Sequence, residues 1–238
     1  MAARPFLAFA CAHMTDERLY AAQIEALGID HDCRVFVFRE QASMQAMAEH
    51  LLAHTPERFT LIGLSLGGYV AFEVIRRALE RLDRLVLIDT TAVADHPARR
   101  EGRLRDIAVV QRGGIEALIP ELPTRWMLPA HARDPALVTL MGSMARSVGA
   151  QGQHHQQTAM LGRPDSHEDL ATVEVPTLLI CGRQDPVTPL ADHEAMAARM
   201  RGSQLIVIED CGHLSTIEQP AAVTLALKNW LASTGSPI

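Results

Sequence analysis

The hexapeptide Gly63-Leu64-Ser65-Leu66-Gly67-Gly68 follows the apolar run Phe59–Leu64 and precedes a stretch whose apolar residues have helical spacing. A serine between a buried strand and a helix occupies a tight turn that exposes its hydroxyl group. Small residues on both sides let the strand and the helix approach each other. The helix also directs backbone N–H groups towards any negative charge that develops beside the serine. The hexapeptide therefore predicts a nucleophile, Ser65. The flanking strand and helix disfavour the alternative, a glycine-rich turn with an incidental serine.

Short apolar runs alternate with helical patterns on both sides of this unit. The runs are continuously apolar, which is typical of strands covered on both faces, as in a parallel sheet. Among the helices, one is capped by Ser43, one is opened by Thr188-Pro189, and the last begins at Pro220 and stops at Gly235. We therefore expect an α/β fold with a doubly wound, mostly parallel sheet. The predicted strands are Phe6–Ala12, Arg34–Phe38, Phe59–Leu64, Leu85–Ile88, Thr177–Cys181 and Leu205–Ile208.

One long segment, residues 96–167, interrupts this alternation because it contains helical patterns and no convincing strand. Asp134-Pro135 is a typical helix start within it. A connection of this length usually carries function. We expect a core made of residues 1–95 and 168–238, with residues 96–167 inserted as a helical cap or lid. An ion pair between Arg163 and Asp165 is expected to anchor the returning loop.

Composition argues against several function classes. The 238-residue chain has a formal net charge of −6, so it offers no basic face for a nucleic acid. No apolar run approaches the length of a membrane span, and the apolar N-terminal segment is shorter than a usual signal peptide. We expect a cytoplasmic protein without nucleic-acid or membrane partners, and the oligomeric state stays open. The cysteines lack CxxC spacing and are expected to be buried free thiols, at Cys11, Cys33, Cys181 and Cys211.

A serine nucleophile needs a base, and the base needs an acid that orients it. Asp185 follows the strand Thr177–Cys181, and His213 follows the strand Leu205–Ile208. The carboxyl ends of parallel strands meet at one edge of a sheet, so both residues are expected to lie near Ser65. We predict these three residues as the catalytic triad.

Two other aspartates lie close enough in the predicted fold to be considered. Asp89 also ends a strand, Leu85–Ile88, and stays as the alternative acid. Asp210 lies close to His213 in the sequence and is expected to shape the histidine loop.

The sequence resembles the α/β-hydrolase superfamily over nearly its whole length. Gly63–Gly68 is similar to the nucleophile elbow of that family, Gly182–Asp185 to its acid loop, and Asp210–Leu214 to its histidine loop. Asp16–Tyr20 is also similar to a segment of a small bacterial esterase-like subgroup. The resemblance implies the α/β-hydrolase fold and a Ser–Asp–His order along the chain.

The resemblance further implies an oxyanion hole made by the backbone N–H of Leu66 and by that of His13 or Met14. The family usually has His-Gly or Pro-Gly after the first strand, whereas this chain has Cys11-Ala12. This departure changes the expected geometry of the hole and brings the side chain of His13 near the site.

The predicted function is hydrolysis of a small carboxylic ester through an acyl-enzyme, which requires no metal or organic cofactor. The acyl pocket is expected under the helical segment. The long apolar residues there equally suit the core of a lid. The candidates for substrate binding are Trp126, Met141, Met144 and Met160.

Other functions use the same residues. A lactonase, a thioesterase or a carbon–carbon bond hydrolase would share the triad, because the pocket decides among them. A cofactor-free lyase or a perhydrolase is an alternative of another class. A non-catalytic ligand-binding protein is the third, and the intact Ser–His–Asp set disfavours it.

Overall fold

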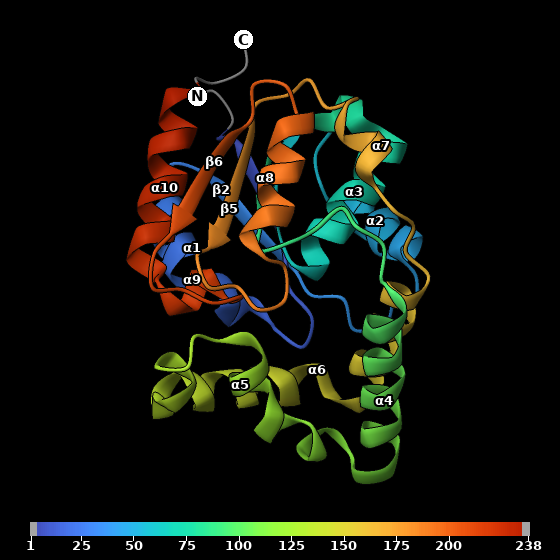
Figure 1. Cartoon of the computed structure of the whole chain (residues 1–238). Coiled ribbons are helices and arrows are strands. Elements are labelled where there is room, and N and C mark those ends of the chain that lie inside the picture. The colour runs from blue at the N-terminus through green and yellow to red at the C-terminus, as the bar shows by residue number, and fades with distance from the viewer. Residues whose placement is uncertain (1–3, 235–238) are drawn as a thin grey trace.

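The sheet is fully parallel and central to the molecule. Residues 4–234 are described by a computed structural model, in which six strands take the order β2-β1-β3-β4-β5-β6. Figure 1 shows the sheet with helices on both sides. The prediction of a doubly wound parallel sheet is confirmed. The strands are β1 (Phe6–Ala10), β2 (Asp32–Phe36), β3 (Phe59–Leu64), β4 (Leu82–Ile88), β5 (Thr177–Gly182) and β6 (Gln204–Ile208).

Successive residues of each strand face opposite sides of the sheet, and each side has its own apolar core. Leu7 and Phe9 of β1 belong to one core, whereas Ala8 and Ala10 belong to the other. Burial on both faces explains why the strands are continuously apolar. The first face is covered by α1 (Ala21–Leu27) and α10 (Pro220–Ser233), and the second by α2 (Met44–Ala53), α3 (Leu66–Ala78) and α8 (Leu190–Arg199).

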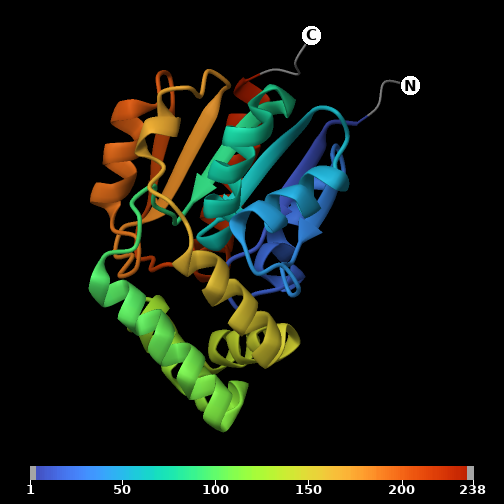
Figure 2. The ribbon, with the colours of Figure 1, turned by 90° about the vertical axis from the view of Figure 1, so that its right-hand side faces the viewer.

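A second group of helices lies across the carboxyl end of the sheet (Figure 2). They are α4 (Pro97–Gly113), α5 (Leu122–Trp126) and α6 (Pro135–Leu161), and residues 97–161 are called the helical segment below. Gly149 interrupts α6 with a φ of 73°, a left-handed conformation that favours glycine. Short elements complete the chain: α7 (His167–Leu170), α9 (Ser215–Glu218), and the 3₁₀ turns Glu17–Tyr20, Leu79–Arg81, Ile115–Ala117, Ile119–Glu121 and His131–Arg133.

Local sequence signals predicted where the helices begin, with one exception at Thr188. The Ser43 side chain caps α2, and Asp134 caps α6. Thr188 does not cap α8, which begins at Leu190, because its hydroxyl donates to Asp185 instead. The predicted stop at Gly235 lies outside the described residues.

Two further expectations can be compared with the structure. The cysteines are free thiols, and all but Cys33 are buried. None of the helices within residues 4–234 combines the length and apolar character that crossing a membrane requires.

Candidate active site

Ser65 occupies the turn between β3 and α3, with a left-handed backbone of φ 52° and ψ −108°. A residue other than glycine rarely adopts a positive φ, so the turn holds this serine under strain. A Cβ on Gly67 would stand 2.0 Å from the carbonyl oxygen of Ala10, and one on Gly63 would stand 2.4 Å from the carbonyl oxygen of Gly67. The small flanking residues therefore permit the close packing that aims the serine.

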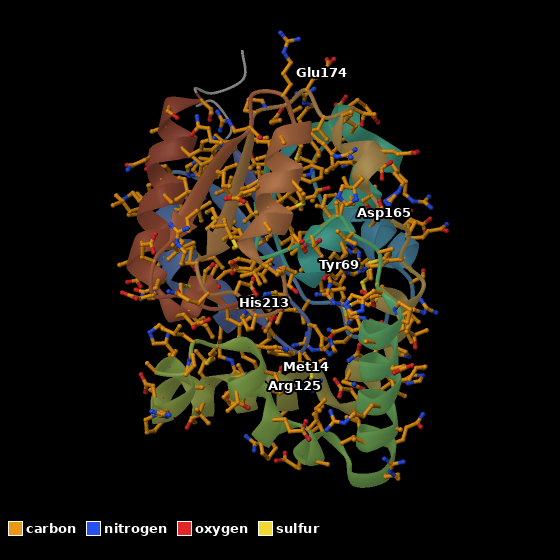
Figure 3. The ribbon with its side chains drawn as sticks, viewed as in Figure 1. Met14, Tyr69, Arg125, Asp165, Glu174 and His213 are labelled. Carbon is orange, nitrogen blue, oxygen red and sulfur yellow. The ribbon has the colours of Figure 1, made fainter. Side chains whose placement is uncertain are left out.

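The side chains of Ser65, His213 and Asp185 form a hydrogen-bonded chain. His213 Nε2 lies 2.9 Å from Ser65 Oγ, and His213 Nδ1 lies 2.8 Å from Asp185 Oδ2. All three residues are buried. In Figure 3, His213 lies at the end of the sheet that faces the helical segment, whereas Glu174 lies at the opposite end. The structure thus brings together the three residues expected at the carboxyl edge.

The loop after β5 holds the carboxylate of Asp185. Its Oδ1 accepts the N–H groups of Val187 and Thr188 at 2.7 and 3.0 Å, and its Oδ2 accepts the Thr188 hydroxyl at 2.7 Å. Burial alone would raise the pKa of Asp185, but His213 and these hydrogen bonds outweigh it and lower the pKa below its ordinary value. An ionised Asp185 stabilises a positive charge on His213.

His213 shows the reciprocal effect. Burial alone would lower its pKa, but the attraction of Asp185 is stronger, and the pKa lies above the ordinary value of a histidine. His213 therefore accepts a proton more readily than a histidine in water.

Asp89, the alternative acid, bonds to backbone groups rather than to His213 within the described residues. Its Oδ1 accepts the N–H of Gly182 at 2.9 Å, and its Oδ2 accepts the N–H of Ser215 at 3.0 Å. Burial, followed by the charge of Asp185, raises the pKa of Asp89 to about 7. Asp89 joins the loops that carry Asp185 and His213, and the geometry favours Asp185 as the acid.

Three side chains of types that can bind a metal ion lie close to the site. Asp89, Cys181 and Asp185 each bring one ligand-type atom within 4.8 Å of the others. All four carboxylate oxygens already accept N–H or O–H groups. Burial raises the pKa of the Cys181 thiol, so it stays protonated. A metal ion needs a thiolate and free carboxylate oxygens, so this group suits internal anchoring better.

The predicted oxyanion donors differ in whether their backbone N–H groups already donate a hydrogen bond. The backbone N–H groups of Leu66 and His13 donate no hydrogen bond to any residue between 4 and 234. The N–H of Met14, by contrast, donates to Gln156 Oε1 at 2.9 Å. Of the two residues that the resemblance left open, His13 is therefore the one with a free N–H group.

The side chain of His13 is neutral and fixed. Its Nδ1 lies 2.8 Å from Gln156 Oε1, and the Gln157 amide nitrogen lies 3.2 Å from its Nε2. An amide oxygen only accepts and an amide nitrogen only donates, so the proton lies on Nδ1. Burial, reinforced by the positive charge of Arg103, lowers the pKa of His13 to about 3. His13 therefore adds no charge to the site at neutral pH.

A cavity of about 380 Å³ lies above Ser65, between the sheet and the helical segment. Trp126 and Met160 line it. Met141 and Met144 are fully buried in the apolar core and are not among its lining residues, so they do not fit the role of substrate contacts. The lining residues are Ala12, His13, Ser65, Tyr69, Arg103, Trp126, Met160, Val187, His213 and Leu214.

Glu218 connects the helical segment to the histidine loop. Its Oε2 accepts the N–H groups of Leu128 and Gly212 at 2.8 and 3.1 Å, and also Nδ1 of His131 at 2.9 Å. Its Oε1 accepts the N–H of Leu214 at 3.0 Å. This one buried carboxylate therefore links the stretch that follows α5, at Leu128 and His131, to the histidine loop.

Sequence reasoning missed several residues around the site. Gln156 and Gln157 are polar residues on a buried helix face, and Glu218 is an isolated acid near an apolar stretch. The sequence offered little signal, because the two glutamines stand in the polar run 151–158, and the burial that requires a polar group to have a partner is not visible there. Arg103 gave no signal, because it is one of several arginines between residues 99 and 105.

The fold and the serine–histidine–aspartate arrangement at the sheet edge define a hydrolase of the α/β type. The model of the alpha/beta hydrolase family matches residues 14–226, so the chain belongs to this family. The prediction of the family from the sequence is confirmed.

The chain is similar to several ester- and lactone-cleaving enzymes. It is 28% identical to 3-oxoadipate enol-lactonase 1 of Acinetobacter baylyi, over 91% of this chain and 84% of the relative. It is also 27% identical to the pimeloyl-[acyl-carrier protein] methyl ester esterase of Nitrosomonas europaea, over 85% and 81%. The chain spans 66% of another relative, 3-oxoadipate enol-lactonase 2 of Acinetobacter baylyi.

A solved structure extends the similarity to three dimensions. The thermophilic esterase of Thermogutta terrifontis has a TM-score of 0.87 and 31% identity, with 99% of this chain and 92% of that chain covered. Ester hydrolysis is the function that these comparisons support.

Proposed function

We propose that the protein hydrolyses small carboxylic esters, with Ser65 as nucleophile, His213 as general base and Asp185 as the orienting acid. The observation that carries this proposal is the hydrogen-bonded chain from Asp185 through His213 to Ser65, with links of 2.8 and 2.9 Å. These distances are within reach for proton transfer.

The reaction follows from the contacts of each group. His213 Nε2 takes the proton of Ser65 as its Oγ attacks the ester carbonyl carbon, while Asp185 stabilises the imidazolium. The N–H groups of Leu66 and His13 would bind the oxyanion of the tetrahedral intermediate. His213 then gives the proton to the departing alkoxide, which leaves an acyl group on Ser65. A water molecule, deprotonated by His213, attacks this acyl-enzyme and releases the acid.

The helical segment acts as a cap in this proposal. It covers the cavity beside Ser65 and contributes Trp126 and Met160 to its wall. These apolar side chains would contact the acyl group, and a small cavity favours short acyl chains. Buried free thiols agree with a cytoplasmic location, which stays part of the proposal.

A lactone is the second candidate substrate. Two of the relatives are named 3-oxoadipate enol-lactonases, and the triad attacks an ester carbonyl in a ring as it does in a chain. The pocket rather than the triad would decide between the two.

The test uses p-nitrophenyl acetate, butyrate and octanoate with the wild type and two variants. Ser65→Ala and His213→Ala remove the nucleophile and the base, and each is expected to lower kcat by a factor of about 10⁴ or more. Ser233→Ala and His154→Ala are matched controls, because both residues are exposed and distant from the triad in the sequence.

Two outcomes would decide the proposal. Turnover that is lost in both site variants and kept in both controls supports it. If the folded wild type hydrolyses none of the esters and a fluorophosphonate does not label Ser65, the proposal is wrong.

A further inference from the structure

A cationic groove continues from the cavity beside Ser65. It spans about 920 Å³ of space, part of which is open solvent, and shares His13, Arg103, Trp126 and Val187 with the wall of the cavity. The shared residues show that the groove lies directly beside the cavity that contains the serine. Its charged lining residues are Arg99, Arg103, Arg125 and Asp106.

Among these arginines, Arg125 has its positive charge balanced by a carboxylate. It pairs with the buried carboxylate of Asp106 at 3.0 Å. Asp106 also accepts from Arg105 at 3.1 Å, and Glu121 pairs with Arg105 at 2.8 Å, so two carboxylates serve these two guanidinium groups.

Arg99 is the most available of the three arginines. Its guanidinium donates to the carbonyl oxygen of Val187, and no carboxylate of residues 4–234 pairs with it. The other N–H groups of Arg99 form no hydrogen bond to this part of the chain. A guanidinium presents a planar fork of donors that matches a carboxylate. Arg99 thus offers a free fork in the wall of the groove.

Arg103 carries a fixed positive charge between the cavity and the groove. Its guanidinium pairs with Asp95, but the same carboxylate also accepts Arg163 Nη2 at 2.9 Å. Arg163 is buried, and its guanidinium carbon lies 4.0 Å from the ring centroid of Tyr69, which lines the cavity. Its Nε has no partner among the described residues. Two guanidinium groups sharing one carboxylate leave an excess positive charge behind the cavity wall.

This charge distribution contrasts with that of the whole chain. The groove is lined by three arginines and one aspartate, whereas the 238 residues carry a formal net charge of −6. A partly enclosed groove focuses the field of its charges and attracts ligands of opposite sign. Arg125 of α5 is labelled in Figure 3, close to the end of the sheet that bears His213. A negative group in the groove would therefore lie beside the candidate nucleophile.

We propose that the ester or lactone substrate carries a carboxylate, which binds in this groove against Arg99 and Arg103 while the scissile carbonyl lies at Ser65. The proposal rests on the proposed function and deepens it by naming the substrate class. Arg99 supplies the donor fork, and Arg103 supplies a charge that its own contacts hold in place.

The experiment compares two esters of equal chain length. The p-nitrophenyl monoester of glutaric acid ends in a carboxylate, whereas p-nitrophenyl pentanoate ends in a methyl group. We expect kcat/KM to be at least about tenfold higher for the anionic ester, a ratio that corresponds to one charge-assisted hydrogen bond. Added sodium chloride is expected to reduce this ratio, because salt screens the attraction.

Variants then locate the anion site. Arg99→Gln and Arg103→Gln are each expected to lower the ratio of kcat/KM values about tenfold. Arg99→Gln is the cleaner variant, since Arg103 also holds Asp95. Arg146→Gln is the matched control, because Arg146 belongs to the same helical segment but is exposed and pairs with Glu116. It is expected to leave the ratio unchanged.

A binding measurement separates this inference from the catalytic proposal. Glutarate is titrated calorimetrically into the wild type and into Arg99→Gln. If no ester is hydrolysed but glutarate binds and requires Arg99, the anion site stands and the catalytic proposal fails. If both esters are hydrolysed with a ratio near one that Arg99→Gln does not change, and glutarate does not bind, the anion site is wrong.

Discussion

The two sides of the site are constructed differently. On the sheet side, short loops and backbone geometry hold the reacting groups, as the positive φ values of Ser65 and Asp89 show. On the side of the helical segment, long polar side chains such as Arg103 and Gln157 define the walls through contacts with residues distant in the sequence. The sheet side, which the backbone defines, suits the reacting groups because their arrangement must stay the same. On the other side, substitution of single side chains can change which substrates bind.

The largest expected effect tests the sheet side at the acid. Asp185→Asn keeps the shape of the side chain but removes the charge that stabilises the His213 imidazolium, so kcat is expected to fall about 10⁴-fold. Esterase kinetics at neutral pH measure this effect. Asp192→Asn is the control, since Asp192 lies in α8, is only half-buried and is not hydrogen-bonded to His213. A loss below tenfold would reopen the assignment of the acid.

The sequence predicted the sheet side well because its signals are local. The glycines around Ser65, and an aspartate or histidine just beyond a strand, are visible within a few residues. Strand limits shifted by a few residues where apolar patterns fade, as in β2, which was predicted two residues too late. The convergence of these residues at one edge of the sheet then followed from the parallel topology.

The side of the helical segment could not be predicted, because its contacts join distant residues. His13 and Gln156 lie 143 positions apart, and no local pattern pairs them. Arg163 was expected to pair with Asp165, but it pairs with Asp95, while Asp165 accepts the N–H groups of Ala94 and His167. Polar pairing depends on which loops meet in space, and periodicity in a single chain does not contain that information.

Two glycines test the difference between the two sides at single positions, because each packs against a different part of the site. A Cβ on Gly182 would stand 2.0 Å from the carbonyl oxygen of Gly212, which would force the acid and histidine loops apart. A Cβ on Gly212 would instead stand 2.6 Å from the backbone nitrogen of Leu128 in the helical segment. Each alanine variant is expected to lower the free energy of unfolding by about 1–3 kcal/mol. We expect Gly182→Ala to lower kcat, and Gly212→Ala mainly to raise KM.

Urea unfolding and ester kinetics measure both effects, and Gly102→Ala is the control because a Cβ there meets nothing within 4 Å. Equal kcat and KM changes in the two variants would contradict the distinction between the sides.

Glu218→Gln tests the connection between the sides. The variant places an amide where the carboxylate accepts four N–H groups, so at least one buried donor loses its acceptor. The free energy of unfolding is expected to fall by about 1–3 kcal/mol. Glu116→Gln is the matched control, since this exposed carboxylate pairs with Arg146 at the surface, where solvent screens the pair, and its loss is expected to lower the stability much less. Similar stabilities for the two variants would show that Glu218 does not hold the helical segment.

The smallest expected effect is a shift in the pH dependence of kcat/KM, because the charge of Asp89 raises the pKa of His213. A protonated His213 cannot accept the proton of Ser65, so kcat/KM is expected to rise with pH through the pKa of His213. Burial alone would lower that pKa, but Asp185 and, more weakly, Asp89 raise it. Asp89→Asn removes one of these charges, so the acidic limb should move to lower pH by less than about one unit. Asp210→Asn is the control because Asp210 is exposed to solvent. A limb that does not move in Asp89→Asn would mean that this carboxyl is uncharged when His213 titrates and acts only through its hydrogen bonds to Gly182 and Ser215.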